Sequence, residues 1–160
     1  MTAEQSPLLV VNELRKEYDR VEQTRVARRR ARFVAVDDVS LTIAAGETLS
    51  VVGESGSGKS TLGQMILGLT TPTSGSITFD GKDITRRTES QRRALTRDIQ
   101  VVFQDPYASL DPRQRVDEII REPLDIHRIG TPADRVERVR EVMKRVALPE
   151  RMAGFYPHQL

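Results

Sequence analysis

The front of the chain carries apolar positions in a strand-like pattern. Three segments rich in β-branched residues cover residues 8–18, 34–43 and 48–52. An Asp80-Gly81 pair stands between two further apolar flanks, which is typical of a tight hairpin turn. The pattern therefore predicts a first half that is rich in β-strands.

Helical spacing begins directly after a glycine-rich loop at residues 53–58. One face of the expected helix, over residues 59–69, is formed by Leu62, Met65, Ile66 and Leu69. A second helix is expected to begin at Thr88, because Thr88 and Gln91 have the spacing of a capping box.

Residues 99–103 are expected to form a further strand, and from Pro112 onward the pattern is helical. Thr131 as N-cap and Pro132 at the first helical position begin a helix that is expected to run through Leu148. Its apolar stripe consists of Val136, Val139, Met143 and Val146. The order of elements predicts a mixed α/β core over residues 1–105 and a helical part over 106–160.

Composition narrows the chemistry that the chain can perform. The 160 residues contain no cysteine, which excludes disulfides, thiolate zinc sites, iron–sulfur clusters and a cysteine nucleophile. The two histidines, His127 and His158, are too far apart for metal-ligand spacing. No apolar run is long enough to span a membrane, and the N-terminus lacks the pattern of a secretory signal. We therefore expect a cytoplasmic protein.

Arginines are concentrated in residues 20–32, within a chain whose net charge is only +2. Such a run could bind nucleic acid or an anionic membrane surface. No aromatic residues alternate with the arginines to stack on bases, and the segment has no apolar period. The sequence therefore favours a solvated, arginine-rich loop and no nucleic-acid partner.

The strongest chemical signal is a complete phosphate-binding loop, or P-loop, of the form G-x-x-x-x-G-K-[ST]. Its residues are Gly53, Glu54, Ser55, Gly56, Ser57, Gly58, Lys59 and Ser60. Glycines let the backbone approach a phosphate closely, and successive N–H groups at a helix start form an anion site. Lys59 is expected to contact the β- and γ-phosphates, Ser60 to bind Mg²⁺, and Thr61 to reach the α-phosphate.

A P-loop identifies a nucleotide but not a reaction. The chain lacks the Asn-Lys-x-Asp sequence that a guanine-specific GTPase needs. A kinase or another P-loop enzyme remains open at this point, as does a nucleotide-binding remnant that performs no catalysis.

The sequence on both sides of the P-loop resembles that of the ATP-binding subunit of an ABC transporter. The resemblance rests on Val36-Asp37-Asp38-Val39-Ser40-Leu41 before the loop and on the Phe103-Gln104-Asp105-Pro106-Tyr107-Ala108-Ser109-Leu110 stretch after it. The latter is most similar to the oligopeptide, dipeptide and nickel importers. The resemblance covers about residues 8–160 and implies a P-loop core, an antiparallel β subdomain and the beginning of a helical subdomain.

The resemblance also implies roles for individual residues. Gln104 occupies the position of the Q-loop glutamine, which senses Mg²⁺ and the γ-phosphate and couples to the membrane subunit. Tyr18 falls where the family has an aromatic residue that stacks on adenine, and Phe33 is the competing aromatic. The implied cofactors are ATP and Mg²⁺. The implied partners are transmembrane permease subunits and a second ATPase subunit in a head-to-tail dimer, at the inner face of the cell membrane.

The chain departs from the family pattern after the helical part. It reaches only the first residue of the signature motif, at Leu160, and contains neither the apolar run ending in Asp-Glu nor the switch histidine. We therefore expect these 160 residues to bind nucleotide without hydrolysing it at a useful rate.

Overall fold

The computed structural model describes residues 6–23, 28–105 and 107–160; for residues 21–23, 28–30 and 108 it describes the backbone alone. The chain forms two compact units, Met1–Gln100 and Val101–Leu160, and each is described by itself. The sequence placed this boundary between residues 105 and 106. Within the described residues, no helix combines the length and the apolar character needed to cross a membrane.

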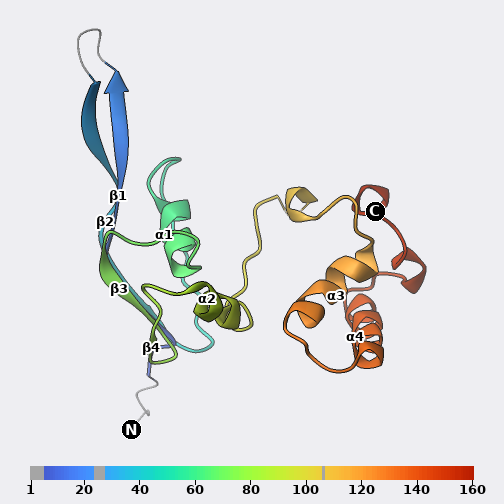
Figure 1. Cartoon of the computed structure of the whole chain (residues 1–160). Coiled ribbons are helices and arrows are strands. Elements are labelled where there is room, and N and C mark those ends of the chain that lie inside the picture. Colours follow the sequence, from blue (N-terminus) through green and yellow to red (C-terminus); the bar gives the residue numbers. More distant parts are fainter. Residues whose placement is uncertain (1–5, 24–27, 106) are drawn as a thin grey trace. The chain divides into compact units, whose positions relative to one another are not determined.

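The first unit is built on a four-stranded antiparallel sheet with the order β2-β1-β3-β4. Its strands are β1 (Leu9–Gln23), β2 (Arg28–Ile43), β3 (Ser74–Phe79) and β4 (Lys82–Asp83). The two long strands, β1 and β2, form a hairpin (Figure 1). The expected antiparallel β subdomain is therefore present, and β1 pairs with both β2 and β3.

The prediction of an arginine-rich loop at residues 20–32 is wrong for the described part of that segment. β1 continues to Gln23 and β2 begins at Arg28, while residues 24–27 lie outside the described residues. Asp19 pairs with Arg32 across the ladder, and the Arg32 side chain is 76% exposed. Backbone pairing alone can order two strands, so their sequence does not need to show an apolar period.

Two further predicted strands, at residues 48–52 and 99–103, are wrong as well. Both segments lack strand pairing in the described structure. Most of their apolar side chains are exposed, with Val52 88% and Val102 90% accessible, whereas Ile99 is half-buried against the core of the first unit. β-branched composition favours an extended backbone, but a strand also requires a neighbour to accept and donate its ladder bonds.

Helix α1 (Lys59–Ile66) packs its apolar face against the sheet. Leu62 and Met65 are buried in one core with Leu14 and Ile77. The helix was expected to continue to Leu69, but it ends at Ile66 and leaves Leu69 54% exposed. Gly68, with φ +72, turns the chain away, as a left-handed glycine after a helix commonly does.

Local turn and cap signals predicted their structures well. Asp80 and Gly81 both have positive φ, 48° and 71°, as a type I′ hairpin turn between β3 and β4 requires. Helix α2 (Glu89–Leu95) begins after Thr88, whose hydroxyl accepts from the Gln91 N–H in a complete capping box.

The second unit contains α3 (Val116–Ile126) and α4 (Pro132–Arg145), with short 3₁₀ turns η1 (Tyr107–Ser109), η2 (Glu150–Met152) and η3 (Pro157–Gln159). Thr131 caps α4 as predicted. The helix ends at Arg145 instead of Leu148. Its predicted stripe is buried only at Val139 and Met143, which pack against Val116, while the two outer valines are exposed.

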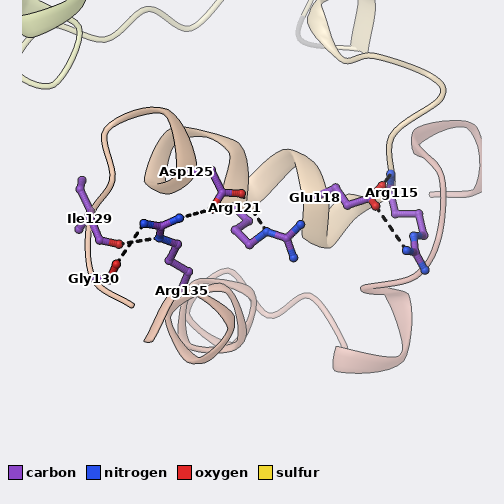
Figure 2. A network of polar contacts seen from close by, with 7 residues as sticks. All are labelled: Arg115, Glu118, Arg121, Asp125, Ile129, Gly130 and Arg135. Carbon is purple, nitrogen blue, oxygen red and sulfur yellow. Dashed lines mark hydrogen bonds and ion pairs between the residues drawn. The ribbon is translucent and has the colours of Figure 1, made fainter. Parts of the chain in front are cut away.

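The Arg135 side chain joins the start of α4 to α3 (Figure 2). Arg135 of α4 donates hydrogen bonds to the carbonyls of Ile129 and Gly130, at 2.9 and 3.1 Å, and pairs with Asp125 of α3 at 2.7 Å. Arg121 contacts the other carboxylate oxygen of Asp125 at 3.0 Å. These bonds from Arg135, and then those from Arg121, hold the pKa of Asp125 below its ordinary value.

We expect the Asp125→Asn variant to lose part of the stability of α3 and α4 in a pH-dependent way. The Asp125 pKa is depressed in the folded state, so its contribution is present above the unfolded pKa of about 3.9 and is lost as the pH falls further. Amide hydrogen exchange in α3 and α4, corrected for intrinsic rates, should separate variant from parent near about pH 6 and converge near about pH 2. Glu141→Gln, which removes an exposed carboxylate of α4 outside this network, should show no such convergence. A difference between Asp125→Asn and parent that stays constant with pH would contradict the assignment.

Candidate phosphate-binding site

The P-loop connects the extended residues 48–52 to the start of α1. Gly56 and Gly58 have φ values of +83° and +93°, which L-residues with side chains rarely adopt. The Ser57 N–H donates to the Glu54 carbonyl at 3.3 Å and closes a turn within the loop. The loop therefore curls back immediately before the helix begins.

Gly58 fixes this loop against the sheet. A Cβ built on Gly58 would lie 2.2 Å from the carbonyl oxygen of Ala35 and 3.4 Å from the Val36 side chain. Val36 is buried in the same core as Leu62 of α1. The first turn of α1 is thus held by direct backbone contact with β2, and only glycine permits that approach.

Lys59 lies across the loop. Its Nζ donates to the carbonyls of Gly53 and Glu54, at 2.8 and 2.6 Å, and to the Ser57 hydroxyl at 3.2 Å. An ammonium has three N–H donors, and here all three contact acceptors of the loop. The positive charge is therefore held over the loop that precedes α1.

The N-terminus of α1 differs electrostatically from those of the other α-helices. α2, α3 and α4 each carry an acidic residue in the first turn, whereas α1 has none and no side-chain hydrogen bond caps it. The partial positive charge of the first N–H groups is thus not met by an acidic side chain within the first turn of α1. Ser60 is exposed in the first turn and Thr61 is half-buried. These groups suit a phosphate that carries Mg²⁺, since a hydroxyl is the hard oxygen ligand that this ion prefers.

Tyr18 lies on β1 in the same unit as the loop. It pairs with Phe33 across the hairpin, and the two side chains are 40% and 49% exposed. The Nζ of Lys16 is 4.9 Å from the Tyr18 ring centroid and also donates to the Thr71 carbonyl, just after α1, at 2.7 Å. Lys16 and Tyr18 therefore share one face of β1, and through Lys16 that face reaches the segment after α1.

The structure thus brings the P-loop residues together and places Tyr18 in the same unit. Gln104 is exposed in the second unit, outside any helix or strand, and its role stays a prediction. Sequence reasoning missed the Ala35 carbonyl and Lys16. The i, i+2 spacing of Lys16 and Tyr18 was a usable signal, whereas no motif indicates a backbone carbonyl.

We expect Gly58→Ala to destabilise the first unit by at least about 2 kcal/mol, since it combines positive φ with a clash against a backbone oxygen. Gly63→Ala is the matched control in the same helix, because its Cβ would meet nothing within 4 Å. That variant should stabilise α1 by about 0.5–1 kcal/mol. Urea unfolding followed by circular dichroism measures both, and equal midpoints for the two variants would contradict the Gly58 contact.

Comparison with known proteins identifies the surroundings of this loop. Residues 36–160 match the profile described as ABC transporter. The chain is 44% identical over 155 residues to a Brucella ovis protein named "Putative peptide import ATP-binding protein", and 48% identical over 126 residues to the oligopeptide transport ATP-binding protein AppF of Bacillus subtilis. These alignments cover 97% and 78% of this chain but 46% and 38% of the relatives, so the chain spans less than half their length.

A solved structure agrees with these matches. The ATP-binding cassette MJ0796, a dimer bound to ADP and Pi in a post-hydrolysis state, superimposes with a TM-score of 0.76 at 30% identity. The match covers 95% of this chain and 62% of MJ0796.

Proposed function

The chain belongs to the ABC transporter family, and we propose that its P-loop and α1 bind the phosphates of MgATP. The observation that carries the proposal is the start of α1. There the Lys59 ammonium lies against the glycine-rich P-loop, and the first turn of α1 contains no acidic residue. Both features favour a multiply charged anion.

Binding requires Lys59 to exchange partners. Its Nζ now contacts two backbone carbonyls and a hydroxyl, which carry only partial negative charge. Phosphate oxygens carry full charge and form stronger, charge-assisted hydrogen bonds with an ammonium. The loop carbonyls thus keep Lys59 close to the site until a phosphate displaces them.

Mg²⁺ and adenine extend the proposed site beyond the loop. A bound Mg²⁺ would supply positive charge against the phosphate oxygens, and Ser60 is the first-turn hydroxyl suited to hold it. Gln104 is proposed as the second metal-sensing residue. Tyr18 is proposed to stack on adenine, supported by its exposure and by the Lys16 contact on one face of β1.

The names of the relatives support a wider proposal. We infer that this chain is part of the energy-coupling ATPase of a peptide importer, working with permease subunits at the cytoplasmic face of the membrane. A head-to-tail dimer with a second ATPase subunit is part of the same proposal, and the dimeric MJ0796 supports it. Disrupting the gene should abolish uptake of a labelled peptide. Unchanged uptake of every peptide tested would refute the substrate class while leaving ATP binding intact.

We expect Lys59→Ala to abolish measurable MgATP binding, because it removes the cation that the β- and γ-phosphates would contact. Titration with a fluorescent ATP analogue measures the dissociation constant. Lys82→Ala is the control, since Lys82 is an exposed lysine of β4 outside the loop. If Lys59→Ala binds the analogue as well as the parent chain, the P-loop assignment is wrong.

Tyr18→Ala and Phe33→Ala distinguish the two aromatic candidates for adenine stacking. Loss of one base–aromatic stack costs about 1–3 kcal/mol, so Tyr18→Ala should weaken MgATP binding by about tenfold or more while Phe33→Ala has a smaller effect. Neither substitution should alter binding of tripolyphosphate, which has no base. The reverse order of the two variants would assign the stacking to Phe33.

A further inference from the structure

The C-terminal end of α1 has no cation of its own. The last turn of the helix contains no basic residue, and the chain reverses at Gly68. The Gly68 N–H donates to the Met65 carbonyl at 3.0 Å and the Leu69 N–H to the Gln64 carbonyl at 2.8 Å. These bonds satisfy two of the last carbonyls and leave the partial negative charge of the helix end to be compensated from elsewhere.

Arg87 supplies that compensation from a distant part of the sequence. It lies between β4 and α2, and its Nη2 donates to the Ile66 carbonyl of α1 at 3.0 Å. Its Nε donates to the Ile84 carbonyl at 2.5 Å, which holds the guanidinium to the end of the hairpin. One planar group therefore joins α1 to the β4–α2 segment, as a rigid donor fork can and a lysine cannot.

The contact is close and desolvated. A Cβ on Gly68 would lie 2.8 Å from Arg87 Nη1, so the guanidinium occupies space that a side chain would fill. Nη1 is buried and has no hydrogen-bond partner among the described residues, and burial lowers the pKa of Arg87. Such burial is unfavourable by itself, so the attraction to the carbonyl end of α1 must offset it.

We propose that Arg87 is a positioning residue for phosphate binding, which clamps the C-terminal end of α1 so that its N-terminal end stays aimed into the P-loop. This inference rests on the proposed MgATP site. An eight-residue helix is only about 12 Å long and behaves as a rigid rod, so a tilt of its C-terminal end turns the N–H groups of its first turn by the same angle. Gly58 holds one end of α1 against Ala35, and Arg87 holds the other.

The test compares Arg87→Met and Arg87→Lys with two controls on the same 160-residue chain. Arg86→Met removes the exposed neighbouring arginine. Thr85→Val removes the hydroxyl that bonds the Ile77 N–H at 2.8 Å, which weakens the hairpin without touching α1. Binding of MgATP and of tripolyphosphate is measured well below each melting temperature, together with hydrogen exchange at the Gly68 and Leu69 amides.

We expect Arg87→Met to weaken both ligands by about tenfold, the scale of one charge-assisted hydrogen bond, and to speed exchange at both amides. Arg87→Lys should recover part of the affinity, and the two controls should bind as the parent does, even where Thr85→Val lowers the melting temperature as much as Arg87→Met.

If Arg87→Met binds MgATP and tripolyphosphate as tightly as the parent, the clamp is overturned. It is also overturned if Thr85→Val loses as much affinity as Arg87→Met. If the parent itself binds no MgATP, the proposed function fails instead. In that case unchanged amide exchange in Arg87→Met would overturn the clamp, and faster exchange would support it.

Discussion

The approach of the Gly58 backbone to the Ala35 carbonyl is the constraint on which the proposed phosphate site depends. It joins the end of the P-loop to β2 at an irregularity of the β1–β2 ladder, where the register shifts between the Lys16–Val36 and Glu17–Val34 pairs. Ala35 lies two residues from Phe33, which pairs with Tyr18. A single backbone contact therefore relates the N-terminal end of α1 to the aromatic pair on the hairpin.

The two ends of α1 differ from those of α2 and α4, which carry an acidic residue in the first turn and basic residues in the last turn. Helices α2 and α4 satisfy their own N-termini with threonine caps and acidic first-turn residues. The first turn of α1 contains no acidic residue. At its C-terminal end, the cation is Arg87, which lies outside the helix and donates to the Ile66 carbonyl. A helix built for stability alone would use neither arrangement. In the proposed site, the N-terminus of α1 attracts the phosphates of the ligand, and the surrounding chain holds the helix in place.

Signals confined to a few neighbouring residues predicted the structure best. The P-loop, the Asp80-Gly81 turn and the Thr88 and Thr131 caps each depend on local geometry, and all are present where expected. The strands predicted at residues 48–52 and 99–103 depend on a pairing partner that local sequence cannot show. The loop predicted at residues 20–32 is wrong for the opposite reason. There, pairing between β1 and β2 orders the backbone although the sequence shows no apolar period. Arg87 donates to the backbone carbonyl of Ile66, 21 positions earlier in the chain, and no sequence motif encodes such a contact.

The central place of β1 in the sheet has a consequence for synthesis of the chain. β1 and β2 can pair as soon as residue 43 has emerged, but the apolar face that includes Val11 and Leu14 becomes buried only with Met65 of α1 and with Ile77 of the neighbouring strand β3. Translation at about 5–20 residues per second leaves that face open to water for a few seconds. A nascent chain held in this interval presents a half-built core, which is the kind of surface that ribosome-associated chaperones bind. Translational pauses between residues 43 and 77 would therefore be the costly ones for this protein.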